Sequence, residues 1–198
     1  MDRLEEALVT HCAPTLAALK PASLFSFRPA SPESLKSLQS AIHSPGQPLG
    51  PCGIRILSLK QFPDSGAHLL YVYREAALQC IVEDPTVRQF LLGSGYPVTA
   101  GCRDLLRHLS RRLCSTAEFP HEIGVFLGYP LQDVQGFIEH CGKAYQYSGC
   151  WKVYHDPEAA KRRFEQFDLC PRIYCERFQR GCPLSQLALP VKSPQYYH

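Results

Sequence analysis

The sequence lacks the short patterns that mark several large classes of enzyme. No GxSxG is present, which argues against the nucleophile elbow of an α/β-hydrolase. His121-Glu122 is not followed by a second histidine one helical turn later, which excludes the zinc-protease pattern. Gly142-Lys143 precedes alanine where a phosphate loop needs serine or threonine. These chemistries are therefore not predicted.

Closely paired cysteines are also missing. The chain has ten cysteines in 198 residues, but no two are spaced as CxxC, which argues against thioredoxin-like exchange and zinc ribbons. In a reducing compartment we expect most of them to be small buried apolar residues or free thiols. A looser set remains a candidate for zinc or iron–sulfur ligation: Cys170, Cys175 and Cys182, with Cys141 or Cys150 as a fourth ligand.

No apolar run reaches the length of about 18 residues that a membrane-spanning helix needs, so we expect no membrane segment. The first residues, MDRLEEALVTHC, are acidic where a signal peptide would be basic and then apolar. We therefore expect a cytoplasmic protein.

Charge of one sign is not concentrated enough to indicate a nucleic-acid partner. The formal net charge is only +3. Arg103, Arg107 and Arg111 recur every four residues, but acidic residues are mixed through the surrounding sequence. This pattern favours a solvated helix face over a nucleic-acid surface.

The composition is that of an ordinary globular domain, with 45% apolar and 20% charged residues. At this length one hydrophobic core is sufficient. We expect a single α/β domain over residues 1–189. Residues 190–198 have no apolar period, which predicts a flexible C-terminal tail.

Residues 119–154 are the stretch around which we expect the fold to be organised. The apolar run 123–127 predicts a strand, Gly128-Tyr129-Pro130 predicts a corner, and an amphipathic helix follows. A second aromatic-rich strand, with the only tryptophan of the chain, completes a β-α-β unit.

Other elements follow from periodicity and turn residues. The apolar spacing in residues 4–19 predicts a helix that Pro14 kinks or divides. The remaining predictions are a strand at 24–27, a hairpin of 54–62 with 68–73, helices that begin at or near Pro32, Glu75, Pro85, Val98 and Pro157, and one more short helix from Cys170.

Strands that alternate with helices predict the fold class. We expect a three-layer α/β arrangement, with a mixed and mostly parallel sheet flanked by helices; an α+β fold is the alternative. Residues 72–77 resemble residues 153–160, since each runs from a strand into a helix. A degenerate internal repeat would explain this likeness, although convergence would also explain it.

The central stretch also carries a family resemblance. The run HEIGVFLGYPLQDVQGFI, followed by GCWKVY, resembles the signature of small uncharacterised bacterial proteins that form a domain-of-unknown-function family. The resemblance extends more loosely to residues 11–14, Lys20 and residues 73–75. It implies no activity; it implies only an association with flavodoxin and ferrous-iron contexts.

The corner at Gly128-Tyr129-Pro130 is the candidate ligand site, because ligands of α/β sheets collect where strands end and helices begin. Asp133 in the first helical turn would repel an anion, so an aromatic or cationic ligand is favoured. Capping of the helix alone would also account for these residues. The candidate ligand-binding residues are Arg74, Glu75, His121, Glu122, Gly128, Tyr129, Asp133, Trp151 and Lys152.

Three functional hypotheses remain open. The first is a small-ligand or cofactor-binding protein linked to redox or iron metabolism, with flavin, haem, iron or zinc as candidate cofactors; the aromatic residues near Trp151 could stack on a flat ring or simply pack in the core. The second is an enzyme that uses His121, Lys152, Arg74 and Glu75. The third is an adaptor that binds another protein through the arginine-rich helix or the C-terminal segment.

Overall fold

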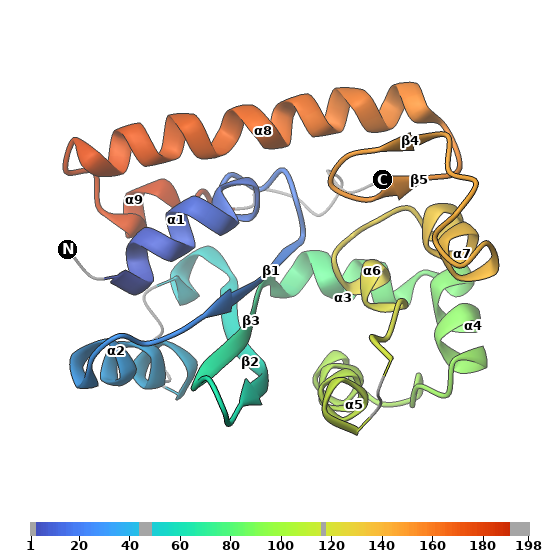
Figure 1. Ribbon diagram of the computed structural model, residues 1–198, viewed down its shortest axis with the longest axis horizontal. Coiled ribbons are helices and arrows are strands. Elements are labelled where there is room, and N and C mark those ends of the chain that lie inside the picture. Colours follow the sequence, from blue (N-terminus) through green and yellow to red (C-terminus); the bar gives the residue numbers. More distant parts are fainter. Residues whose placement is uncertain (1–2, 44–48, 116–117, 191–198) are drawn as a thin grey trace.

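The computed structural model of the chain describes residues 3–43, 49–115 and 118–190. Helices surround a small central sheet, and a two-stranded hairpin lies to one side (Figure 1). The elements are α1 (Arg3–Leu16), β1 (Ala22–Phe27), α2 (Pro32–His43), the 3₁₀ helix η1 (Gly50–Cys52), β2 (Ile54–Phe62), β3 (Ala67–Arg74), α3 (Glu75–Glu83), α4 (Pro85–Gly93), α5 (Cys102–Ser115), α6 (Ile123–Phe126), α7 (Leu131–Glu139), β4 (Tyr147–Ser148), β5 (Lys152–Val153), α8 (Pro157–Gln179) and α9 (Leu184–Leu187).

The central sheet has the strand order β1-β3-β2, and both pairings are antiparallel. Side chains alternate between its two faces, as they must in a strand. On β3, Leu70 and Val72 face one hydrophobic core while Tyr71 faces the other. The sheet is therefore buried on both sides.

The first core fills the space between the sheet, α1, α2 and the C-terminal half of α8. It includes Leu8 and Cys12 of α1, Phe25 of β1, and Tyr174 and Phe178 of α8. α1 joins this core through apolar residues spaced three or four apart, which place one stripe of the helix against the sheet.

The second core lies on the opposite face of the sheet, under α3, α4, α5 and α6. Leu105, Leu109 and Leu113 line the buried face of α5. The Tyr71 hydroxyl donates a hydrogen bond to the Phe126 carbonyl at 2.5 Å, which joins the sheet to α6. Both cores are thus tied to one central strand.

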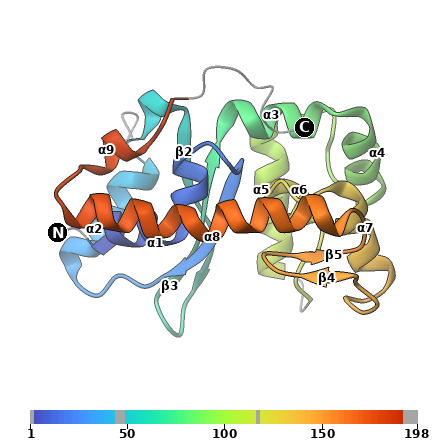
Figure 2. The same ribbon diagram turned by 90° about the horizontal axis from the view of Figure 1, so that it is seen from above.

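Helix α8 spans the length of the molecule (Figure 2). Its C-terminal half packs in the first core, whereas Phe164 and Phe167 pack in a third cluster with Trp151 and Val153 of the β4–β5 hairpin. This helix therefore holds the hairpin beside the rest of the fold.

The predicted three-layer α/β fold is wrong, and the α+β alternative describes the structure. Both sheets are antiparallel, so the mostly parallel sheet is absent from the described part of the chain. Residues 123–127 provide the main error: α6 occupies Ile123–Phe126 and is buried all round. A short, wholly apolar run has no periodicity that separates a buried strand from a buried helix.

The structure also gives no support to the possible internal repeat. Residues 72–77 run from β3 of the central sheet into α3, whereas residues 153–160 run from a two-residue strand of the hairpin into α8. The two segments belong to different sheets with different neighbours. Their likeness reflects only a strand followed by a helix.

Two prolines interrupt their helices less than the sequence predicted. Pro14 lies in the last turn of α1, where the helix ends two residues later. Pro171 lies inside α8, yet the helix continues through it. The buried positions Phe167, Cys170 and Tyr174 form one stripe across Pro171, and this packing outweighs the missing hydrogen bond.

The predicted strand at 24–27, the hairpin, and the helices α2, α3, α4 and α5 are confirmed, with shifts of a few residues at their ends. No helix in the part of the chain that the structure describes is long and apolar enough to cross a membrane. Residues 191–198 of the predicted tail lie outside the described residues.

Candidate functional site

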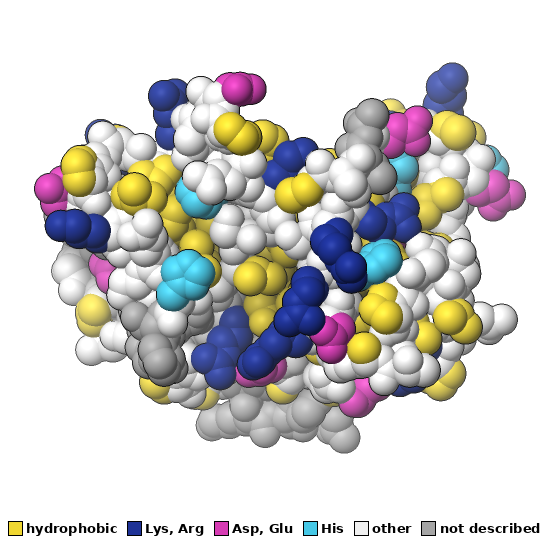
Figure 3. All heavy atoms as spheres, turned by 90° about the horizontal axis from the view of Figure 1, so that it is seen from below, with side chains coloured by type: hydrophobic (Ala, Val, Ile, Leu, Met, Phe, Trp, Pro, Cys, Tyr) yellow, Lys and Arg dark blue, Asp and Glu magenta, His cyan; other side chains and the backbone are white. Residues whose placement is uncertain are grey.

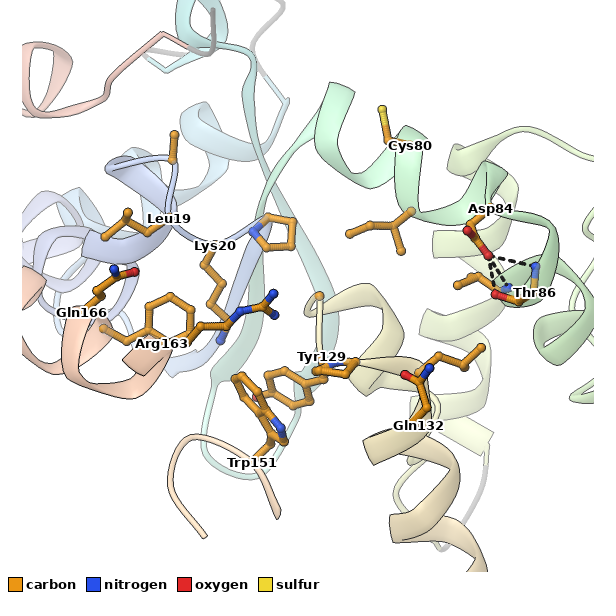
Figure 4. A pocket seen from close by; sticks show the side chains of 18 residues that line it. Leu19, Lys20, Cys80, Asp84, Thr86, Tyr129, Gln132, Trp151, Arg163 and Gln166 are labelled. Carbon is orange, nitrogen blue, oxygen red and sulfur yellow. Dashed lines mark hydrogen bonds between the residues drawn. The ribbon is translucent and has the colours of Figure 1, made fainter. Parts of the chain in front are cut away.

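A cavity of about 640 Å³ lies where the loop after α1 meets α8, the start of α7 and the junction of α3 with α4 (Figure 4). Segments far apart in the sequence form its wall: Ala18, Leu19, Lys20 and Pro21 from the loop after α1; Cys80, Ile81, Asp84, Thr86 and Val87 around the α3–α4 junction; Gly128, Tyr129, Pro130, Leu131 and Gln132 from the corner before α7; Trp151; and Arg163, Gln166 and Phe167 from α8. We call it the main cavity.

The charged side chains in this wall are Lys20, Arg163 and Asp84. The amino group of Lys20 and the guanidinium group of Arg163 both point into the cavity (Figure 4). Asp84 instead caps α4, since its Oδ1 accepts hydrogen bonds from the backbone N–H groups of Thr86 at 2.8 Å and Val87 at 3.1 Å. The wall therefore presents an excess of positive charge.

The loop that carries Lys20 is fixed by backbone hydrogen bonds. Ala18 has a left-handed conformation with φ of 59°. The N–H groups of Leu19 and Lys20 both donate to the Pro14 carbonyl, at 2.8 and 3.1 Å. The loop thus turns sharply at the end of α1 and directs Lys20 to the cavity.

The Lys20 side chain is half-buried, and its amino group lies near two aromatic rings. Its Nζ lies 5.2 Å from the ring centroid of Tyr129 and 6.0 Å from that of Phe167. Among the described residues it makes no ion pair with a carboxylate. Burial lowers the pKa of the Lys20 ammonium from its ordinary value. A cation in this setting favours an anionic neighbour.

Arg74, a predicted ligand-binding residue, lines neither the main cavity nor the second cavity described below. It instead binds the end of α1, where the loop that carries Lys20 begins. Its side chain is 1% exposed. Nε donates to the Thr15 carbonyl at 2.6 Å, Nη2 donates to Leu16 at 2.7 Å and Leu189 at 2.8 Å, and Nη1 donates to Cys52 at 3.3 Å. Arg74 therefore joins the end of α1 to η1 and to the C-terminal segment.

Gly128 permits the close approach of the two loops that meet in the main cavity. Its φ is +75°, a conformation that residues with a Cβ seldom adopt. A Cβ at this position would lie 2.2 Å from Cγ of Pro21, the residue after Lys20. Glycine is therefore required here for two independent reasons.

Replacing Gly128 by alanine is expected to lower the free energy of unfolding by about 2 kcal/mol or more, because of the backbone strain and the contact with Pro21. Chemical denaturation measures the change. Gly93→Ala is the control, since nothing lies within 4 Å of a Cβ built at Gly93. Equal stability of the two variants would contradict the role given to Gly128.

Tyr129 and Trp151 form an aromatic wall. Their rings stack with centroids 4.9 Å apart, and the Tyr129 hydroxyl donates to the Cys150 carbonyl at 3.3 Å. Phe164 meets Trp151 edge to face at 4.4 Å. Burial raises the pKa of Tyr129 to about 12, so its hydroxyl stays protonated at neutral pH.

Asp133 holds Trp151 in position. Its carboxylate accepts hydrogen bonds from Trp151 Nε1 at 2.7 Å and from the backbone N–H groups of Tyr154 and His155 at 2.7 and 2.9 Å. The side chain is buried and is not part of the main cavity. The anion repulsion expected of Asp133 therefore does not apply to that cavity.

A second cavity of about 490 Å³ lies on the other side of the aromatic wall, and Tyr129 and Trp151 line both cavities. Three further predicted site residues, His121, Asp133 and Lys152, line this second cavity. His121 packs against Phe137 with ring centroids 4.8 Å apart. Lys152 Nζ donates to the Gly142 carbonyl at 2.5 Å. Most of the remaining wall is apolar.

Glu122 and Glu75 lie outside both cavities. Glu122 is buried, pairs with Arg112 Nε at 2.9 Å, and accepts a hydrogen bond from the Tyr96 hydroxyl at 2.9 Å. Burial raises the pKa of that hydroxyl. Glu75 is exposed and pairs with Arg55 at 3.2 Å. The structure thus does not bring His121, Lys152, Arg74 and Glu75 into one constellation.

The candidate metal ligands Cys170, Cys175 and Cys182 lie along α8 and just after it. Cys170 is buried in the first core, and burial raises the pKa of its thiol to about 11. Across residues 3–43, 49–115 and 118–190, no group of three or more His, Cys, Asp or Glu side chains could hold a metal ion. The geometry gives no support to a metal site at these cysteines.

Figure 3 shows basic side chains among acidic and hydrophobic ones on one face of the molecule. Arg103, Arg107 and Arg111 are exposed. Arg107 pairs with Asp104 one turn earlier. This mixture agrees with a solvated helix face.

Sequence reasoning placed Gly128, Tyr129 and Trp151 among the candidate site residues, and the structure places all three in the wall of the main cavity. It missed the cations. Lys20 appeared only at the margin of the family resemblance, and Arg163 was not among the candidate site residues. No local pattern could have joined them, because the cavity forms only when the loop after α1 meets α8.

The fold and the site define a small α+β protein with a basic, aromatic-walled cavity. The chain belongs to the family described as "Protein of unknown function (DUF3793)", whose family model matches residues 8–188. This confirms the resemblance to an uncharacterised domain-of-unknown-function family. No curated protein and no solved structure matches the chain.

Proposed function

We propose that this protein binds a small anionic ligand with a flat, unsaturated part in the main cavity. The observation that carries the proposal is the pair of cations, Lys20 and Arg163, in a wall whose one carboxylate, Asp84, already caps a helix. The anionic group of the ligand pairs with the cations. The flat part packs against Tyr129 and Phe167, the two rings that flank Lys20.

The size of the cavity supports a ligand of small-cofactor dimensions. Its volume of about 640 Å³ lies within the range of about 300–1,000 Å³ that is usual for small-molecule sites. Gln132 and Gln166 add amide groups to the wall, which can orient polar edges of a ring. A bare inorganic anion would leave most of the apolar wall uncovered.

The only tryptophan of the chain makes the test direct, because Trp151 lies in the cavity wall. Its fluorescence is measured while the full chain is titrated with flavin mononucleotide, pyridoxine 5′-phosphate or adenosine monophosphate. We expect a saturable change with at least one of these probes, weakened by salt. If none of them produces a saturable change, the proposal falls.

Replacing Lys20 or Arg163 by methionine is expected to weaken binding of the responding probe by about tenfold or more, because each variant loses one charge-assisted contact of about 1.5–3 kcal/mol. Arg162→Met is the matched control: Arg162 is the neighbouring arginine of α8, is exposed like Arg163, and is not part of the cavity wall. The Trp151 titration gives all the dissociation constants. If Arg162→Met weakened probe binding as much as the other two variants, the loss would come from the change in net charge, which would contradict the role given to Lys20 and Arg163.

The enzyme and the protein-binding adaptor are separate hypotheses from this proposal. An enzyme built on His121, Lys152, Arg74 and Glu75 is not supported, since Arg74 and Glu75 lie outside the cavity that His121 and Lys152 line. Protein binding stays a prediction; α8 leaves Leu169 and Ile173, one turn apart, 53% and 45% exposed. A link to redox or iron metabolism rests on the family resemblance alone. Titration with flavin mononucleotide, one of the three probes, tests whether the cavity binds a flavin.

A further inference from the structure

The lysines of the described chain differ in what their amino groups contact. Lys60 donates to the Leu113 carbonyl at 2.7 Å, and Lys161 pairs with Glu158 at 2.6 Å. Lys152, which lines the second cavity, donates to the Gly142 carbonyl, and Lys36 and Lys143 are exposed. Lys20 is the member of this set whose amino group points into a large cavity and faces ring surfaces instead of an acceptor.

We propose that Lys20 is a covalent attachment point, and that its amino group forms an imine with an aldehyde or ketone group of the anionic ligand. The inference rests on the proposed function, because it names the chemistry of the same cavity. Before the reaction both cations pair with the anionic group of the ligand. Once the imine has formed, Arg163 holds the anionic group and the former carbonyl carbon is bonded to Lys20.

The surroundings of Lys20 favour the neutral amine that this reaction needs. The groups that face it are Tyr129 and Phe167, the Arg163 guanidinium in the same wall, and the thiols of Cys12 and Cys150. Burial lowers the pKa of the Lys20 ammonium, and the raised pKa values of both thiols keep them neutral. Desolvation of a lysine in this way is a recognised route to an amine nucleophile.

The proposed step balances without a further reactant. The Lys20 ammonium first releases one proton to solvent, and the neutral nitrogen attacks the carbonyl carbon to form a C–N bond. The carbonyl oxygen then leaves as water, with the two hydrogens that remained on the nitrogen. The product is an imine, and no electron is transferred to or from an outside group.

Pyridoxal 5′-phosphate is a suitable probe, because it combines a flat ring, a phosphate and an aldehyde. The full chain is incubated with it, reduced with borohydride, digested, and analysed by peptide mass spectrometry. We expect labelling of Lys20 at least tenfold faster than that of exposed Lys143. Pyridoxine 5′-phosphate, which has an alcohol in place of the aldehyde, should protect Lys20.

Two variants separate covalent attachment from simple binding. Lys20→Arg keeps the positive charge but has no amine that forms a stable imine. We therefore expect it to lose the borohydride-stable adduct, while its binding of pyridoxine 5′-phosphate, measured by Trp151 fluorescence, is weakened less than in Lys20→Met. Lys143→Arg should leave both results unchanged. If Lys20→Arg does not fold, protection of wild-type Lys20 by the alcohol decides the question.

The possible failures are distinguishable. If pyridoxine 5′-phosphate binds but Lys20 is labelled no faster than Lys143, or without protection, the imine is overturned and the proposed function stands. If no probe binds and Lys20 is not labelled, both fall. Preferential labelling with protection supports both.

Discussion

Replacing Asp133 by alanine is expected to lower the free energy of unfolding by about 3 kcal/mol or more. The carboxylate accepts hydrogen bonds from Trp151 Nε1 and from the N–H groups of Tyr154 and His155. Its loss leaves these donors without their acceptor: the Trp151 Nε1–H is buried and the two backbone N–H groups are partly buried. An unsatisfied buried donor costs about 1–3 kcal/mol. Chemical denaturation followed by circular dichroism measures the change.

Gln135→Ala is the matched control for this substitution, because Gln135 is an exposed residue of the same helix. We expect it to change stability by less than about 0.5 kcal/mol. The Asp133 variant should also show altered Trp151 fluorescence in the folded state. A variant as stable as wild type, with unchanged fluorescence, would show that the β4–β5 hairpin does not depend on this carboxylate.

Replacing Arg74 by methionine should destabilise the protein at least as much, by about 4 kcal/mol or more. Arg74 donates to four carbonyl groups, and hydrogen bonds of a charged donor contribute about 1.5–3 kcal/mol each. Lysine should not restore the loss, since one ammonium cannot reproduce the fork of a guanidinium. Thermal and chemical denaturation measure both variants.

The control is Arg55→Met. Arg55 pairs with Glu75, but its side chain is 38% exposed, so we expect a change of less than about 1 kcal/mol. In the Arg74 variant the loop that carries Lys20 loses its support, and binding in the main cavity should weaken as well. Stability within about 1 kcal/mol of wild type for Arg74→Met would refute the structural role of this residue.

Local signals predicted the elements whose ends carry turn or capping residues. Ser31 before Pro32 marked the start of α2, and its hydroxyl does accept a hydrogen bond from the Ser34 N–H at 3.2 Å. The hairpin β2–β3 was likewise marked by turn residues between two apolar runs. Such signals act over a few residues, and so they can be read from the sequence.

The errors came from features that depend on distant contacts. The run 123–127 is helical because it packs inside the second core, and α8 passes through Pro171 because its two halves pack on different clusters. The role of Asp133 was misjudged for the same reason. Its position in the first turn of a helix predicts an interaction with the helix dipole. The hydrogen-bond donors to Asp133 come instead from the later β4–β5 hairpin and the residue that follows it.

The aromatic wall of Tyr129 and Trp151 gives the molecule a property that neither cavity has alone. Because the two rings border both cavities, a ligand that displaces them in one cavity reshapes the other. The two occupancies are then thermodynamically linked, and any coupling free energy acts equally in both directions. An apolar molecule in the second cavity would in this way act as an effector of the first.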